Sequence, residues 1–416
     1  MTHPRRPPLP LPPPLRGAEY GSFAHQTVVE RLPRIARRVL EENDYSPAVT
    51  ARLHTLIEDI PEANVRLLRD TTAPDTADWS HYLAPHLEHN WLEVPWFFAE
   101  TYFYRRILEA TGYFYVGPDE RVDPFAPHKR QSMEESRQAI GELCHRLAAW
   151  RKGGWGGGAL AGLLEISLWG NQGDLSMWPD GAAERPERPD ESDAGDYVLV
   201  DDSAGVEAFL ARTAGEAEGE RVRVDVLMDN AGLELVSDLA LVDYLLDSGR
   251  AAVVVLHLKP HPLFVSDVTV EDLQQTVAAL TVADEEVVCA FGRRLRGYLD
   301  EGFIQLQNDY FWTSPLPAWE MPADLRESLA RAHLVISKGD ANYRRVLGDR
   351  HWAFTTPFAR IVSYFPAPLL ALRTFKSEVA AGIPAARLAE LNREYPGWTT
   401  SGRWGIIQFS AADETS

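Results

Sequence analysis

One stretch decides the fold of this chain: Arg221-Val-Arg-Val-Asp-Val-Leu-Met-Asp-Asn-Ala-Gly-Leu-Glu234. Its first part, up to Met228, is rich in β-branched and other apolar residues and predicts a buried β-strand. An apolar helical pattern follows from about Leu233 and stops before Gly249, and residues 252–258 form a second buried strand pattern. A strand, a helix and another strand in this order are typical of a parallel sheet with helical crossovers.

The same alternation continues downstream of this stretch. Further strand patterns cover residues 303–306, 333–337 and 369–372, and helical patterns cover 270–280, 285–299 and 342–347. Upstream, the region 27–150 shows apolar residues at helical spacing and few strand signals, and it includes an aromatic-rich helix over 91–108. We therefore predict an α/β fold with a mainly parallel sheet, preceded by an all-helical N-terminal part.

Composition predicts four segments. A proline-rich arm covers 1–18, a helical N-terminal domain 19–180, an acidic linker 181–197 and an α/β domain 198–416. The glycine-rich loop 153–158 lacks the Gly-Lys-Ser/Thr ending and the preceding strand of a phosphate loop, so we interpret it as a flexible joint.

The overall composition limits the possible partners. The chain has 41 Lys and Arg against 61 Asp and Glu, a net charge of −20, and no Lys/Arg-rich run, which disfavours binding to nucleic acid or to an anionic membrane. No run approaches the roughly 20 apolar residues of a membrane span. Only Cys144 and Cys289 are present, which suits a reducing compartment. We expect a cytoplasmic protein with no obligate protein partner.

Polar residues follow each predicted strand at the point where it ends. In a doubly wound sheet, ligands bind beyond the carboxyl ends of the strands, so these residues are candidates for a shared site. They are Asp229-Asn230, Lys259 with the later Asp267, Asn308-Asp309, Lys338-Gly339-Asp340, and Arg373 to Lys376.

Asp229, Asn230 and Asp267 offer only oxygen donors, which suit Mg²⁺ or Mn²⁺. The alternative is that Asp229-Asn230 caps the helix that begins near Leu233, because Asp and Asn are favoured N-caps. At Lys338-Gly339-Asp340, a glycine at a strand-to-helix junction allows an anion to approach free N–H groups. The alternative there is an ordinary tight turn with a solvated lysine.

Other classes of site are disfavoured. His257 and His261 lack a third ligand at zinc-site spacing, because one lies in a strand and the other between two prolines. No Gly-x-Ser-x-Gly elbow and no Gly-x-Gly-x-x-Gly motif follows a strand, which argues against a serine hydrolase and a dinucleotide enzyme.

Two motifs, Leu227-Met-Asp-Asn-Ala-Gly-Leu-Glu234 and Ser337-Lys-Gly-Asp-Ala-Asn-Tyr-Arg344, resemble the damage-control phosphatase family, also catalogued as domain of unknown function 89. Arg373-Thr-Phe-Lys376 resembles the Arg-Thr-x-Lys signature of subfamily III, whose members are acidic-residue-methyltransferase-1-like. Segments 21–33, 95–106 and 168–176 are also similar to the family, so the resemblance extends over nearly the whole chain.

The resemblance implies a three-layer α/β/α core with a helical N-terminal part. It further implies a divalent metal at Asp229, Asn230 and Asp267, with Mn²⁺ foremost and Mg²⁺, Co²⁺ or Ni²⁺ as alternatives. The implied reaction is hydrolysis of small phosphorylated metabolites, in particular the ketose phosphates fructose 1-phosphate and fructose 6-phosphate. The implied substrate contacts are Asp229, Asn230, Asp340, Ala341, Asn342, Tyr343, Arg344 and Lys376.

In this mechanism the catalytic candidates are Asp229, Asn230, Asp340 and Lys376. Either water or Asp229 attacks the phosphorus, and Asp340 is the candidate general acid or base for attack by water. Lys376 would hold phosphate oxygens; the alternative is an isolated surface lysine.

Three residues of the family-like helical segments are expected to line the sugar side of the pocket, or else to form salt bridges at the edge of the core. They are Glu100, Arg105 and Asn171. Two further functions remain open: an S-adenosylmethionine-dependent carboxyl methyltransferase, for which no glycine-rich cofactor loop follows the first strand, and a non-catalytic sugar-phosphate-binding protein.

Overall fold

The computed structural model describes residues 5–117, 119–170, 197–216 and 221–411. Its centre is a seven-stranded sheet in the order β1-β7-β6-β5-β2-β3-β4. The strands are β1 (Val198–Asp201), β2 (Arg223–Leu227), β3 (Val253–Leu258), β4 (Ile304–Asn308), β5 (Leu334–Lys338), β6 (Leu369–Thr374) and β7 (Gly405–Ser410). Strands β2 to β6 run parallel, whereas β7 pairs antiparallel with β6 and parallel with β1.

Side chains on the two faces of the sheet enter two separate hydrophobic clusters, because successive residues of a strand point to opposite faces. In β6, Leu370 and Leu372 belong to one cluster, whereas Leu369 and Ala371 belong to the other. Both faces are therefore covered, and the core is a three-layer α/β/α sandwich, as predicted.

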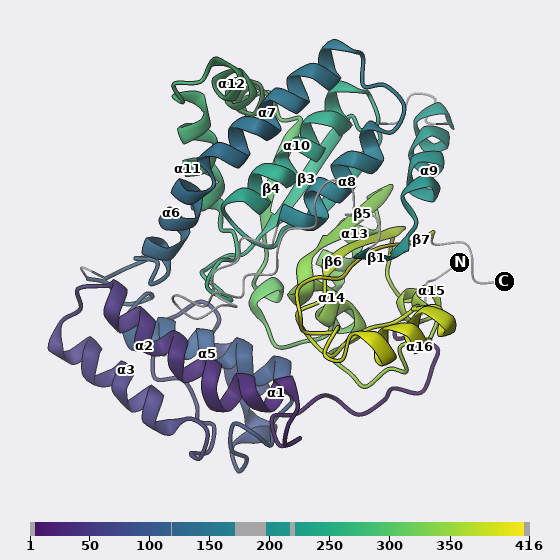
Figure 1. Ribbon diagram of the computed structural model, residues 1–416. Helices are drawn as coiled ribbons and strands as arrows, with labels where there is room; N and C mark the ends of the chain where they lie inside the picture. The colour runs from purple at the N-terminus through teal and green to yellow at the C-terminus, as the bar shows by residue number, and fades with distance from the viewer. Residues whose placement is uncertain (1–4, 118, 171–196, 217–220, 412–416) are drawn as a thin grey trace.

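One face of the sheet carries the helices that cross between β2, β3 and β4 together with three helices from other parts of the chain (Figure 1). They are α7 (Arg137–Lys152), α8 (Ala159–Trp169), α9 (Ser203–Glu216), α10 (Leu233–Asp247), α11 (Val270–Thr281) and α12 (Glu286–Asp300). Helix α8 packs on the sheet and α7 packs on α10 and α12 of the same layer, although both lie within the predicted helical domain 19–180. The predicted boundary near residue 180 therefore does not separate the two packing units.

The other face carries C-terminal helices and the N-terminal helical part. The C-terminal helices are α13 (Ala323–Leu329), α14 (Gly339–Leu347), α15 (Phe358–Val362) and α16 (Ala385–Glu394). The helical part comprises α1 (Phe23–Gln26), α2 (Leu32–Glu42), α3 (Pro47–Asp59), α4 (Thr76–Leu83) and α5 (Trp96–Thr111), and α6 (Ala126–Glu135) joins it to α7 (Figure 1).

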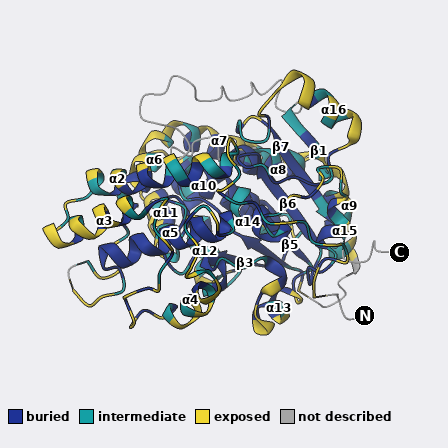
Figure 2. Cartoon of the chain, turned by 90° about the horizontal axis from the view of Figure 1, so that it is seen from below, coloured by how far each residue is buried: buried dark blue, intermediate teal, exposed yellow. Residues whose placement is uncertain are grey.

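Helix α5 is buried over its whole length (Figure 2). It begins at Trp96, after Pro95, later than the predicted helix start at Trp91. Its aromatic residues pack on the rest of the helical part; the Tyr102 ring, for example, lies 4.9 Å from that of Trp91. A helix that is apolar on all sides is stable only when neighbours surround it, and α5 has them on every side.

The proline-rich arm is extended, and its last residues are hydrogen-bonded to both parts of the molecule. Leu15 donates its main-chain N–H to Asp349 O (3.0 Å) and accepts from Trp96 N (2.8 Å). The His351 N–H reaches Pro13 O (3.1 Å). The arm therefore connects the start of α5 with the loop after α14. Among the described helices, none is long and apolar enough to cross a membrane.

Candidate active site

The candidate site lies where the connections of the sheet change direction. From β2 the chain proceeds to β3 and β4 on one side, whereas β5 and β6 lie on the other side of β2. Ligands of open α/β sheets bind at such a switch point, beyond the carboxyl ends of the strands. The loops after β2 and β5 meet here, so Asp229 comes to lie next to the start of α14.

Gly339 allows the Asp229 carboxylate to sit against the N-terminus of α14. A Cβ added at Gly339 would lie 1.8 Å from Asp229 Oδ2, and Gly339 has φ +81°, so both space and backbone conformation require glycine. Burial and the carboxylates of Glu234 and Asp267 raise the pKa of Asp229 well above its ordinary value. The site therefore concentrates negative charge that a cation would neutralise.

The amide of Asn230 is held from both ends. Its Nδ2 donates to Asp229 Oδ2 (2.9 Å) and to Glu234 Oε2 (2.8 Å), and its Oδ1 accepts from Ser266 Oγ (2.7 Å). An amide oxygen has two lone pairs, and Ser266 uses one of them. The second lone pair of Asn230 Oδ1 can therefore coordinate a cation. The helix-cap alternative is wrong, because the N-cap of α10 is Gly232 and no side chain caps it.

Asp267 is brought to Asn230 by a strained loop. The two residues form an isolated antiparallel bridge, and Phe264 and Val265 before it have φ values of 46° and 68°. Positive φ is strongly disfavoured for a β-branched residue such as Val265 and is typical of functional loops. Lys259 Nζ lies 3.3 Å from Asp267 Oδ2. The loop thus carries the third proposed donor.

Asp340 is fixed as an ionised acceptor. Its Oδ1 accepts from Arg373 Nε (2.8 Å) and from Ser377 Oγ (3.0 Å), and it lies 3.4 Å from Lys376 N. Although burial opposes it, the Arg373 and Arg344 charges hold the pKa of Asp340 below its ordinary value. A carboxyl with a lowered pKa is ionised at neutral pH, which disfavours the general-acid half of its predicted role.

Lys376 lies at the same rim. Its positive charge partly counteracts the rise in the pKa values of Asp229 and Glu234 that burial and neighbouring carboxylates cause. The lysine is 9 % exposed, so it is not the isolated surface side chain of the alternative interpretation.

Lys338 differs from the alternative interpretation of this junction, a turn with a solvated lysine, because its side chain is buried. Its Nζ lies 3.2 Å from Asp238 Oδ1 and 3.6 Å from Glu234 Oε1, and it donates to Ser167 O (2.5 Å). An amphipathic lysine next to two buried acids is drawn into the interior to compensate their charge. Lys338 is therefore not a solvated turn residue; whether an anion binds the N–H groups of α14 is a separate prediction.

The remaining predicted contacts on α14 have different surroundings. Asn342 joins α14 to the end of β2, because its Nδ2 donates to Met228 O (3.1 Å) and Lys338 O (2.9 Å). Tyr343 is buried and donates to Gln408 Oε1 (3.0 Å). Ala341 is partly exposed in the first turn of the helix.

Glu100 and Arg105 both form the salt bridges that were the alternative to lining the pocket. Glu100 Oε2 accepts from Arg344 Nη1 (2.6 Å), which couples α5 to α14. Arg105 is fully buried in the helical part, with Nη1 2.7 Å from Asp70 and Nε 2.8 Å from Asp75. Asn171 lies outside the described residues.

The donor set fits a hard divalent cation. Two carboxylates and one amide oxygen provide three oxygen donors, and the first carboxylate is destabilised by the second in the absence of positive charge. Within the described ranges, no group of three His, Cys, Asp or Glu side chains is placed to hold a metal ion. The proposed set is not such a group, because it has two acids and its third ligand is the amide of Asn230.

Comparison with known proteins identifies the family. The sequence profile of the damage-control phosphatase ARMT1-like domain matches residues 27–391. The chain belongs to the damage-control phosphatase ARMT1-like family. It is 34 % identical to damage-control phosphatase ARMT1 of Danio rerio, over 96 % of this chain and 98 % of that protein, and 30 % identical to the Homo sapiens protein, over 96 % and 98 %.

A solved structure of a DUF89 family protein from Pyrococcus horikoshii matches 86 % of this chain and 92 % of its own, with 15 % identity and a TM-score of 0.47. As a member of the damage-control phosphatase family, the chain is a phosphatase, and its substrates are small phosphorylated metabolites.

No role was predicted from the sequence for three residues of this candidate site, although Lys259 and Arg373 were among the polar residues at strand ends. They are Lys259, which pairs with Asp267; Ser266, which holds Asn230; and Arg373, which holds Asp340. Lys259 carried a signal, because it directly follows a buried strand. Ser266 and Arg373 act through side-chain contacts whose partners the sequence pattern does not specify.

Proposed function

We propose that this phosphatase requires a divalent cation, foremost Mn²⁺, held by Asp229, Asn230 and Asp267, and that it hydrolyses ketose phosphates such as fructose 1-phosphate and fructose 6-phosphate. The observation that carries the proposal is the placement of the buried Asp229 carboxylate against Gly339 at the switch point. The family membership supports the reaction class, and the resemblance of Arg373 to Lys376 to the subfamily III signature supports the sugar phosphate.

A divalent cation bound here would act as a Lewis acid on a phosphate oxygen. The residues of the chain would complete the site around it. Lys376 would neutralise a second phosphate oxygen, and the free N–H groups in the first turn of α14 would donate to a third. Arg373 fixes Asp340 and thereby the position of the Lys376 main chain.

Asp229 would serve either as a cation ligand only or also as the nucleophile that forms an aspartyl phosphate. In the first case, Asp340 is suited to accept a proton from water rather than to donate one, because its pKa is lowered. Quench-flow with ³²P-labelled substrate separates these routes, since only nucleophilic attack by Asp229 leaves an acid-stable phosphoryl group on the protein.

Glu100 would act on the substrate indirectly, through Arg344, because its carboxylate is engaged by that guanidinium. The Arg344 guanidinium lies 3.6 Å from the centre of the Trp96 ring and is therefore fixed in orientation. This arrangement makes Glu100 a positioning residue.

The test is the release of inorganic phosphate from fructose 1-phosphate and fructose 6-phosphate with Mn²⁺, Mg²⁺, Co²⁺ or Ni²⁺, and after chelation. We expect hydrolysis only with a divalent cation, and a loss of about 10³-fold or more in kcat for Asp267→Asn, as is found when a principal charge-stabilising group is removed. Undiminished activity in the chelated protein or in Asp267→Asn would exclude the proposed cation site. Binding of substrate without turnover would instead indicate a sensor.

A further inference from the structure

A cavity lies on the side of the molecule where the helical part meets the C-terminal half of α14. Its volume is about 330 Å³, at the lower end of the range for small-molecule pockets. Its walls come from the arm, α4, the start of α5, the segment 315–320 and residues 344–350. Of the described residues, those that line it include none of Asp229, Asn230, Asp267, Asp340 and Lys376.

Arg345 is the unusual residue of this cavity. It is 2 % exposed, yet it forms no ion pair with any carboxylate of the described residues. Its guanidinium donates to neutral oxygens: Nη1 to Leu316 O (2.7 Å) and Ser314 Oγ (3.4 Å), and Nη2 to Trp312 O (3.0 Å). The Asp267 carboxylate interacts with Arg345 electrostatically but forms no ion pair with it. Buried charges in proteins are normally paired, so an arginine held in this way is ready to receive an anion.

The other charged residues of the cavity do not neutralise Arg345. The lining contains three arginines and two carboxylates, and the Glu100 carboxylate, outside the lining, pairs with Arg344 (2.6 Å). The three arginines are thus matched in number by three carboxylates, yet none of these three forms an ion pair with Arg345. Asp349 is already engaged, because it accepts from Arg344 Nε (2.7 Å) and from Phe97 N (3.0 Å). Glu320 is exposed at the rim.

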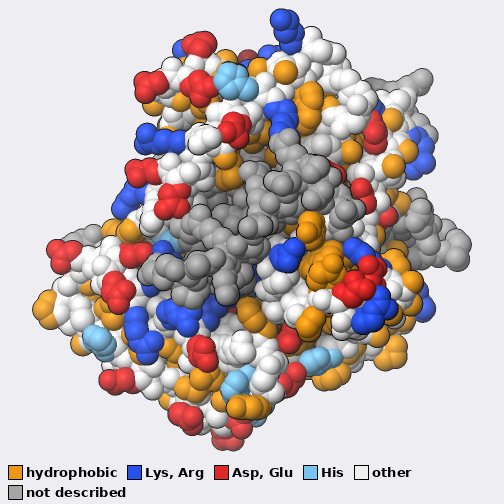
Figure 3. All heavy atoms as spheres, viewed as in Figure 1, with side chains coloured by type: hydrophobic (Ala, Val, Ile, Leu, Met, Phe, Trp, Pro, Cys, Tyr) orange, Lys and Arg blue, Asp and Glu red, His pale blue; other side chains and the backbone are white. Residues whose placement is uncertain are grey.

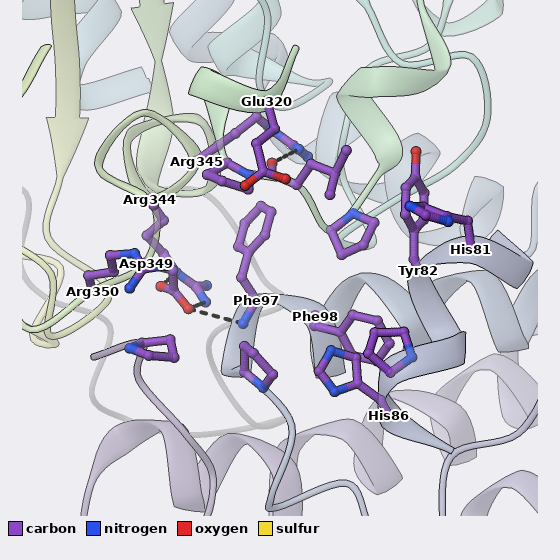
Figure 4. A pocket seen from close by; sticks show the side chains of 17 residues that line it. His81, Tyr82, His86, Phe97, Phe98, Glu320, Arg344, Arg345, Asp349 and Arg350 are labelled. Atoms are coloured by element: carbon purple, nitrogen blue, oxygen red, sulfur yellow. Dashed lines mark hydrogen bonds and ion pairs between the residues drawn. The ribbon is translucent and has the colours of Figure 1, made fainter. Parts of the chain in front are cut away.

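The opposite side of the cavity is aromatic. Figure 4 shows the Phe97 ring between Arg345 and the Arg344–Asp349 pair, with Tyr82 across from the arginines. The Arg345 guanidinium lies 4.9 Å from the centre of the Phe97 ring. The cavity thus offers a positive charge on one side and ring faces on the other.

We propose that this cavity binds a small organic monoanion, a carboxylate with an aromatic or apolar body. The carboxylate of the ligand would pair with the Arg345 guanidinium. Its apolar body would pack on the aromatic wall, beside the Phe97 ring. Arg345, which forms no ion pair with the described residues, matches one negative charge, whereas a phosphate dianion would leave one charge uncompensated beside Asp349 and Glu320. The volume also exceeds what an inorganic ion would fill.

Benzoate tests the proposal, with benzamide as the neutral probe of the same shape. Isothermal titration of the full-length protein should show one benzoate site, with benzamide at least about 10-fold weaker, since a charge-assisted bond accounts for 1.4 kcal/mol or more. Benzoate binding should be retained or strengthened in Asp267→Asn, because this change removes a carboxylate charge that acts on Arg345 without lining the cavity. This result separates the cavity from the proposed cation site. Equal binding of benzoate and benzamide, or loss of benzoate binding in Asp267→Asn, would overturn the proposal.

Two variants locate the binding. Arg345→Gln removes the charge and should weaken benzoate about 10-fold or more. Leu316→Trp fills the cavity, leaves the Leu316 main-chain acceptor for Arg345 in place and should abolish benzoate binding. If Arg345→Gln fails to fold, Leu316→Trp still decides the question. Wild-type affinity in Leu316→Trp would show that benzoate binds elsewhere and would reject the proposed cavity.

Discussion

Asp229 is a buried carboxylate whose surroundings oppose its ionisation. Burial together with Glu234 and Asp267 raises its pKa, so in the metal-free protein the ionised form lowers the stability of the folded state. The sign follows from linkage: the stability contribution of Asp229 is present at low pH, where the group is protonated, and is lost as the pH rises through the elevated pKa. Active sites often retain charged groups that lower the stability of the folded state.

Asp229→Asn is therefore expected to stabilise the metal-free protein at pH 8 by about 1–2 kcal/mol while it abolishes cation-dependent phosphatase activity. Thermal unfolding with and without Mn²⁺ measures the stability, and the variant should also lose the cation-induced rise in Tm. Release of inorganic phosphate measures the activity. Asp243→Asn is the matched control, since this buried carboxylate pairs with Arg294 (2.7 Å) and its loss should destabilise. A lower Tm for metal-free Asp229→Asn would contradict this account of the site.

Gly339 is required by the approach of the Asp229 carboxylate. In Gly339→Ala the new methyl group would collide with Asp229 and force the carboxylate away from α14, in addition to the strain of φ +81°. We expect a loss of about 10²-fold or more in kcat/KM, as misplacement of a reacting group by 1 Å can cause. Gly249→Ala is the control, because Gly249 has φ +72° but no atom within 4 Å of its added Cβ. Similar activity losses in both variants would mean that strain, not the collision, is responsible.

At the scale of elements, helix α5 supports the loop that carries Asp267. The Phe264 ring of this loop lies 5.1 Å from Tyr104 and 5.9 Å from Phe97. A residue held at positive φ, as Phe264 is, retains that conformation only when its neighbours fix it. The helical part therefore supports, through packing, the loop that carries the proposed cation ligand Asp267.

Tyr104→Leu should raise the Mn²⁺ concentration needed for half-maximal activity by about 3-fold to 10-fold, a change of about 1 kcal/mol, because the loop loses one of its two aromatic supports. Titration of activity with Mn²⁺ measures the effect. Phe103→Leu is the control, since Phe103 is equally buried on α5 and its ring contacts Tyr104 rather than Phe264. An equal shift in both variants would attribute the change to general destabilisation of α5.

The sequence allowed the five parallel strands to be predicted, because each is a short apolar run that ends in polar residues. It did not predict β1 and β7, since Val198–Asp201 is very short and Gly405–Ser410 includes polar Gln408, whose burial depends on its bonds to Tyr343 and Ala381. The rim residues were predictable from strand ends. The direction of Lys338 was not, because it depends on the position of Asp238 in a helix that packs from another part of the chain.

At the scale of the whole molecule, the surface is mixed in charge despite the excess of acids. On the described part of the face in Figure 3, acidic and basic side chains are interspersed and form no extended basic area. Positive charge is instead buried at specific places: on Lys376 at the carboxyl ends of the strands, and on Arg345 in the cavity beside α14. An anionic metabolite is thus attracted only at short range, where screening by salt is weak.

The arm joins the helical part to the α/β core, so its removal should uncouple the two. Deletion of residues 1–14 removes the Pro13 acceptor of His351 and the Pro12 acceptor of Arg350 (2.5 Å), as well as the packing of Leu9 and Leu11 on the core. We expect Tm to fall by several degrees, which corresponds to about 2–4 °C per kcal/mol for a large domain, and unfolding to separate into two transitions. Calorimetry measures both effects.

The matched control for the deletion is Pro10→Ser, because Pro10 is exposed and its side chain leaves the hydrogen bonds of the arm intact. Activity adds a second readout, since Leu15 hydrogen-bonds to Asp349, which orients the same Arg344 that Glu100 engages. Loosening the arm should therefore raise KM for the sugar phosphate more than it lowers kcat, because the hydrogen bonds of the described part of the arm reach Asp349, His351 and Arg350 rather than the proposed cation ligands. An arm deletion that retains a single, unshifted transition would show that the two parts are held together without the arm.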